Sequence, residues 1–80
     1  GRYDIMQVPA EKNDNAIVME FKVHEPDEET SLQDTVQSAL KQIQEKNYDA
    51  ELLAQGIPTD RIRHYGFAFE GKKVLIGTDA

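Results

Sequence analysis

The segment "AIVMEFKV", residues 16–23, constrains the fold more than any other stretch because two kinds of side chain alternate along it. Successive side chains of a β-strand point to opposite faces of the sheet. As a strand, the segment has an apolar face and a charged face, formed by Ile17, Met19, Phe21 and Val23 on one side and by Val18, Glu20, Lys22 and His24 on the other. The sequence therefore predicts a strand with one face that carries chemically active groups.

Patterns on either side predict the remaining elements. Residues 3–8, "YDIMQV", have strand character, and the short polar loop 9–15 predicts an antiparallel hairpin with residues 16–23. Apolar residues at helical spacing follow Ser31, which with Asp34 makes a capping box, so a helix is expected to end near residue 46 or 47.

The C-terminal half predicts a shorter helix and two more strands. The short helix, "DAELLAQG", would have Asp49 as its N-cap and Gly56 at its end. Residues 61–80 carry β-branched and aromatic residues on both sides of a turn near Gly71. The predicted order is strand, strand, helix, short helix, strand, strand.

Length and composition narrow the class of protein. Eighty residues suffice for one domain, 1–80, and the strand-like start "GRYDIM" indicates a piece of a larger protein. No apolar run approaches the roughly 18 residues that cross a bilayer, so no membrane partner is expected. Cysteine is absent and the net charge is −6, which argues against disulfides and against nucleic-acid binding by general electrostatics.

Two carboxylates are expected to meet across the first hairpin. If Val8 pairs with Ala16, then Asp4 faces Glu20, with Cβ atoms roughly 4.5–5.5 Å apart. Facing like charges destabilise a sheet, so a compensating cation is expected, and Mg²⁺ suits one or two carboxylates with water and phosphate. The carbonyl oxygen of Phe21 could add a ligand, and Lys22 could orient a water or stabilise phosphorane charge.

Spacing alone does not establish this chemistry. A Glu and a Lys two positions apart on an exposed strand are more often a solvated pair than a catalytic one. His24 is expected to face solvent at the strand end, and the acidic run 25–29 to be a solvated loop. Phe67 and Phe69 are expected to pack in the core against the helices.

Four blocks taken together resemble a known family. "GRYDIM", "AIVMEFKV", "ALKQIQEKNYDAELLAQGI" and "HYGFAFEGKKVLI" occur in the order found in the PD-(D/E)XK nuclease superfamily. They are most similar to the branch found at the C-terminus of bacterial AAA-type ATPase-like proteins. The resemblance implies an α/β (α+β) fold, a mixed sheet of about four strands flanked by helices, with a restriction-endonuclease-like core that lacks its first helix.

The resemblance also implies site residues, cofactors and partners. Asp4 and Glu20 match the acidic residues that bind metal in the family, and Lys22 matches its catalytic lysine. The implied cofactor is Mg²⁺ or Mn²⁺. Gln42 and Tyr48 match polar positions that support the site or contact DNA, although Gln44 also fits the Q-x-x-x-Y spacing. The implied partners are nucleic acid and an ATPase domain of the same polypeptide, and the implied location is the cytoplasm.

Two departures from the family pattern have consequences. The first motif contains "YD" where the family has "PD", and the sequence begins too late to include the helix before the first strand. An exposed hydrophobic edge or face could then drive formation of a homodimer. Two alternatives to a nuclease stay open: an inactive relative that binds DNA or protein, and a structural oligomerisation domain.

Overall fold

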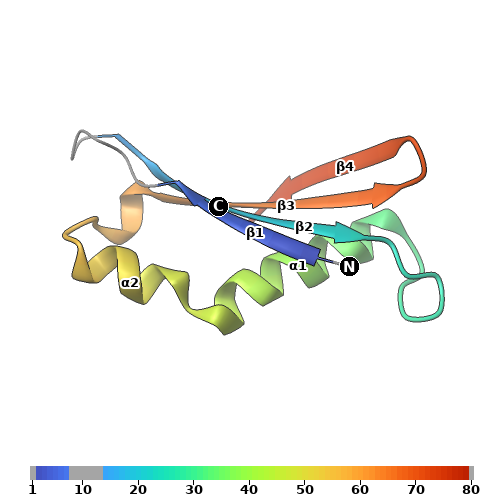
Figure 1. Cartoon of the computed structure of the whole chain (residues 1–80), viewed down its shortest axis with the longest axis horizontal. Helices are drawn as coiled ribbons and strands as arrows, with labels where there is room; N and C mark the ends of the chain where they lie inside the picture. Colours follow the sequence, from blue (N-terminus) through green and yellow to red (C-terminus); the bar gives the residue numbers. More distant parts are fainter. Residues whose placement is uncertain (1, 8–13, 80) are drawn as a thin grey trace.

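The computed structural model describes residues 2–7 and 14–79, in which four strands and two helices follow the predicted order (Figure 1). The elements are β1 Arg2–Gln7, β2 Ala16–Val23, α1 Leu32–Lys46, α2 Tyr48–Ala54, a 3₁₀ turn Thr59–Arg61, β3 Ile62–Glu70 and β4 Lys73–Thr78. Val8, the predicted end of the first strand, and most of the loop 9–15 lie outside the described residues.

The four strands form one mixed sheet in the order β1-β2-β3-β4. β1 is antiparallel to β2, as the short loop predicted, and β3 is antiparallel to β4. β2 and β3 are parallel, so the chain must cross from one end of the sheet to the other between them. The helices α1 and α2 lie in this crossover, which makes the fold α/β (α+β) with a mixed sheet, as expected.

α1 covers one face of the sheet and begins as the capping box predicted. The Ser31 hydroxyl accepts a hydrogen bond from the N–H of Asp34 at 3.2 Å, while Asp34 accepts one from the N–H of Thr30 at 3.1 Å. The buried face of the helix packs on the sheet in a core that includes Val36, Leu40 and Ile43 of α1, Ala16 and Val18 of β2, Leu52 of α2 and Ala68 of β3. Figure 1 shows both helices on the same side of the sheet.

The face of β2 that α1 covers is the charged one. Val18, Glu20 and Lys22 are all buried, whereas Phe21 is half-buried and Val23 is exposed on the opposite face. The helix supplies enough apolar surface to cover Val18 and Ala16, and the charged groups are enclosed with them. The charged face of this strand is therefore inside the protein.

The opposite face of the sheet has no helix over it among the described residues, and we call it the open face. It carries the apolar side chains Ile5, Phe21, Val23, Phe67, Phe69, Val74 and Ile76. The Phe21 ring stacks on Phe67 and Phe69, with centroid distances of 4.7 and 6.1 Å. The prediction that Phe67 and Phe69 pack against the helices is therefore wrong, because the small residues of β3 face α1 instead.

Two glycines allow α1 to lie close to the sheet. Gly66 of β3 and Gly77 of β4 are paired in the sheet, directly under Val36. A Cβ atom at Gly66 would lie 2.9 Å from the Val36 carbonyl oxygen, and one at Gly77 would lie 2.5 Å from Val36 Cγ1. Side chains at these positions would push the helix away from the sheet.

The short helix begins two residues earlier than predicted. Asn47 ends α1 in the left-handed conformation, with φ of 55°, and α2 starts directly after it at Tyr48. The prediction that Asp49 is the N-cap is therefore wrong, and its carboxylate contacts His64 instead. Neither helix in the described part of the chain is long and apolar enough to span a membrane.

Candidate active site

Asp4 and Glu20 face each other across the hairpin, as the assumed register predicted. The register pairs Asp4 with Glu20 and Met6 with Val18. Glu20 is fully buried beneath α1, while the Asp4 side chain, on the edge strand β1, is 21% exposed. The site that the two carboxylates form is therefore buried at Glu20 and accessible to solvent at Asp4.

The ammonium group of Lys46 lies between these carboxylates. Lys46 is the last residue of α1, and its Nζ donates to Asp4 Oδ1 at 2.9 Å and to Glu20 Oε1 at 3.5 Å. The hydrogen bond to Asp4, against an opposing effect of burial, raises the pKa of Lys46, and Glu20 adds to the increase. The cation expected from the facing carboxylates is thus supplied in this structure by a lysine that the sequence analysis did not identify.

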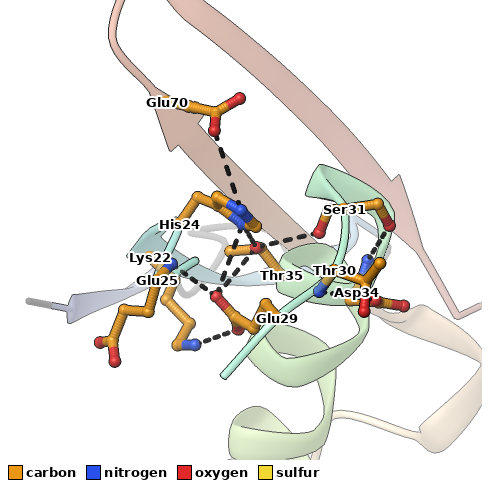
Figure 2. Close-up of polar contacts among 9 residues, drawn as sticks. All are labelled: Lys22, His24, Glu25, Glu29, Thr30, Ser31, Asp34, Thr35 and Glu70. Atoms are coloured by element: carbon orange, nitrogen blue, oxygen red, sulfur yellow. Dashed lines mark hydrogen bonds and ion pairs between the residues drawn. The ribbon is translucent and has the colours of Figure 1, made fainter. Parts of the chain in front are cut away.

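Lys22 is buried and forms an ion pair with Glu29. Its side chain is 2% exposed, and its ammonium donates to Glu29 Oε2 (Figure 2). Glu29 follows a turn in which the N–H groups of Glu28 and Glu29 both donate to the carbonyl oxygen of Glu25. This turn brings the loop back over the end of β2, so a carboxylate from the acidic run reaches the lysine.

The Glu29 carboxylate accepts hydrogen bonds from three donors, which hold it in place. Besides Lys22, the N–H of Glu25 donates to Oε1 at 2.8 Å and the Thr35 hydroxyl donates at 3.0 Å. Burial alone would raise the pKa of Glu29, but these three hydrogen bonds outweigh burial and lower it. The expectation that residues 25–29 are all solvated is wrong for Glu29.

His24 belongs to the same cluster and does not face solvent. Its side chain is 6% exposed, and Nδ1 lies 2.7 Å from Thr35 Oγ1. Nε2 lies 3.8 Å from Glu70 Oε2, at the end of β3 (Figure 2). The expectation of an exposed His24 is therefore wrong, because the loop after β2 and the first turn of α1 cover it.

The polar residues that the family resemblance added make the following contacts in the described part of the chain. Gln42 donates to Glu45 of the same helix at 3.1 Å, and Gln44 donates to Asp79 at 3.4 Å. Tyr48 is partly buried and packs against the hydrophobic core. A supporting or DNA-contacting role for Gln42 and Tyr48 stays a prediction.

The donor set fits a hard divalent cation that retains water ligands. Two carboxylates from facing residues converge closely enough for one ammonium group to bond with both. The Phe21 ring lies on the open face, so only the main-chain oxygen of Phe21 could serve as a ligand. Among the described residues no group of three His, Cys, Asp or Glu side chains could hold a metal, so main chain, water or substrate would complete the coordination.

Comparison with known proteins assigns the chain to a family. A search of the curated proteins and a search of the solved structures found no match to the chain. A family model described as PD-(D/E)XK nuclease superfamily matches residues 1–79. That match covers both strands of the hairpin, the crossover helices and the remaining strands. The chain belongs to the PD-(D/E)XK nuclease superfamily.

Proposed function

We propose that this domain hydrolyses phosphodiester bonds in nucleic acid, with DNA as the expected substrate. The observation that carries the proposal is the facing pair Asp4 and Glu20, with Lys22 two residues farther along the same face, in a chain of this superfamily. Asp4, Glu20 and the Phe21 carbonyl oxygen would hold Mg²⁺ or Mn²⁺. A metal ion bound there would polarise the phosphodiester and make water a stronger nucleophile.

The side chains have distinct roles in this proposal. Asp4 and Glu20 bind the cation, and Lys22 supplies a positive charge to the developing phosphorane. Glu29 keeps the Lys22 ammonium on the covered face by its ion pair. Glu20 and Lys22 are buried, so substrate would approach from the side of Asp4 and Lys46, whose side chains are 21% and 34% exposed.

A second candidate function is binding of DNA or protein without cleavage. It is favoured by the pairing of every charged group at the site with an opposite charge. Lys22 is paired with Glu29, and Lys46 is paired with both metal-binding candidates. A site that is neutralised in this way has less need of a metal ion.

Partners and location complete the proposal. We infer that the domain works with an ATPase domain of the same polypeptide, which is supported by the sequence resemblance described above. Two copies would associate through the open face, where Ile5, Val23, Val74 and Ile76 are each between 42% and 52% exposed. A cytoplasmic location is supported by the absence of cysteine.

The decisive experiment is cleavage of linear and circular DNA with Mg²⁺, with Mn²⁺ and with a chelator. We expect metal-dependent cutting by the wild type and a loss of at least about 100-fold in Glu20→Gln and Lys22→Met. Glu28→Gln and Lys41→Met change exposed residues of the same charges and should retain activity. Metal-dependent binding of DNA without cutting would favour the second candidate, and cutting that persists in Glu20→Gln would refute the assigned site.

A further inference from the structure

Lys46 differs from Lys22 in how firmly it is held. Lys22 is 2% exposed, and its partner Glu29 is fixed by two further hydrogen bonds. Lys46 is 34% exposed and extends from the last position of α1. Its ammonium touches the two carboxylates that the proposed function assigns to the metal ion, at 2.9 and 3.5 Å.

We propose that Lys46 is the resident counter-cation of Asp4 and Glu20, and that a divalent metal ion must displace it to bind. The side chain therefore lowers the metal affinity of the site. This inference rests on the proposed function because it uses the same two carboxylates. The inference goes beyond the proposed function because it assigns a role to Lys46, which that proposal does not use as a metal ligand or as the catalytic lysine.

Geometry and charge make the two cations mutually exclusive. A Mg²⁺ ion lies about 2.0–2.1 Å from each oxygen ligand and requires near-octahedral coordination. The Lys46 ammonium already donates to Asp4 Oδ1 and to Glu20 Oε1. A divalent ion bound to these oxygens would repel the ammonium at a separation of a few ångströms.

The displaced side chain has a suitable place to go. The Lys46 side chain is 34% exposed at the solvent-accessible end of the site, so its flexible stem can carry the ammonium into solvent. The ammonium would stay near the C-terminus of α1, where the helix dipole favours a positive charge. Lys22 has no such exit, and its charge would remain at the site when the metal ion is bound.

Mn²⁺ affinity, measured by titration calorimetry, tests the inference without using catalysis. The comparison is between the wild-type chain, Lys46→Met and Lys46→Gln, with Lys41→Met as control. Lys41 lies on the same helix, is 74% exposed and forms an ion pair with Glu45, away from the two carboxylates. We expect both Lys46 variants to bind Mn²⁺ about tenfold more tightly, which corresponds to about 1.4 kcal/mol, and Lys41→Met to bind like the wild type.

Melting temperatures give a second readout that separates competition from a merely structural contact. In EDTA, Lys46→Met should melt below the wild type because the facing carboxylates lose their counter-charge. Saturating Mn²⁺ should remove that deficit, because the metal ion then compensates the carboxylates in both proteins. A deficit of equal size in EDTA and in Mn²⁺ would overturn the inference.

Failure of this inference is distinguishable from failure of the proposed function. Equal Mn²⁺ affinity of wild type and both Lys46 variants, with binding lost in Asp4→Asn and Glu20→Gln, would overturn the role of Lys46 and leave the metal site in place. No Mn²⁺ binding by the wild type or by any Lys46 variant would overturn the inference together with the proposed metal site.

Discussion

Among single residues, Glu29 has the largest unanticipated role. A buried lysine requires a counter-charge, since an isolated ammonium is costly to remove from water. Glu29 supplies that charge to Lys22 from a loop that the sequence presents as an ordinary acidic run. In this fold the buried Glu29 carboxylate compensates the charge of Lys22 beneath α1.

Glu29→Gln is expected to destabilise the domain by about 3 kcal/mol, because it leaves the buried Lys22 ammonium without its counter-charge. Urea denaturation followed by circular dichroism measures the change. Glu28→Gln, an exposed neighbour in the same loop, should change stability by less than about 0.5 kcal/mol.

A double-mutant cycle isolates the ion pair. Lys22→Met combined with Glu29→Gln should cost less than the sum of the two single changes, because the second change removes a charge that has already lost its partner. Strict additivity would show that Lys22 and Glu29 contribute independently.

Between elements, the close approach of α1 to β3 and β4 depends on the paired glycines. A side chain at Gly77 would meet the Val36 side chain, whereas one at Gly66 would meet the Val36 main-chain oxygen as well as Ala39 and Leu40. A side-chain contact can be relieved by shortening the neighbour, but a main-chain contact cannot.

Gly66→Ala and Gly77→Ala should each destabilise the domain by about 1–3 kcal/mol, the usual cost of overpacking. In a Val36→Ala background the cost of Gly77→Ala should fall, while that of Gly66→Ala should persist. Denaturant midpoints of the two glycine variants in each background, compared with wild type and with Val36→Ala, measure this. Equal relief at both glycines would contradict the predicted difference between them.

A second link between elements is pH-dependent. His64 of β3 contacts Asp49 of α2 at 2.7 Å and Asp79, just after β4, at 2.9 Å. Burial acts to lower the pKa of His64, but the two carboxylates outweigh burial and raise it above 6.5. The imidazole therefore joins the short helix to the chain after the last strand, and the raised pKa of His64 favours its charged form.

The contribution of His64 to stability should be lost with rising pH. Because the folded pKa is raised, the contribution is complete below about pH 6.5 and disappears as pH rises through the folded value. The difference in unfolding free energy between wild type and His64→Gln, roughly 0.5–1 kcal/mol for such a pair, should therefore shrink as pH rises above 6.5. Parallel stability curves for the two proteins across this range would refute the charged bridge.

In the molecule as a whole, the two faces of the sheet are unequal. α1 lies over one face of the sheet (Figure 1). That face holds Asp4, Glu20 and Lys22, whereas the aromatic stack of Phe21 and Phe67 lies on the open face. The homodimer proposed above would cover this exposed apolar surface. Face-to-face packing of two such sheets, about 10 Å apart, would bury it.

Ile76→Lys should shift the chain toward a monomer, because it introduces a charge within the proposed contact, where Ile76 is 52% exposed. Sedimentation velocity across a range of protein concentrations measures the effect. Gln37→Lys adds the same charge at an exposed position of α1 and should leave association unchanged. A wild type that is monomeric at all concentrations would refute the homodimer.

The charge of the whole chain predicts weak DNA binding. With a net charge of −6, few phosphates can be neutralised without a metal ion, so affinity for duplex DNA should be low and should fall further with salt. Fluorescence anisotropy with a labelled duplex at several salt concentrations measures this. A tight complex that is insensitive to salt would contradict the prediction.

The sequence by itself determined the local structure and the hairpin register. Periodicity located β2 and α1, the capping box located the start of the helix, and the short loop made β1 antiparallel to β2. These features depend on neighbours close in the chain. The same register brought Asp4 opposite Glu20, so the two carboxylates of the site were predictable.

Only the tertiary structure decided which face of the sheet is covered and which charges meet. α1 lies on the charged face of β2 because Gly66 and Gly77 admit it there, a choice that the alternation in β2 leaves open. That packing buries Lys22, and it brings Glu29 and Lys46 to partners 7 and 26 or more residues away. Such pairs follow from the path of the chain in space, which no local pattern specifies.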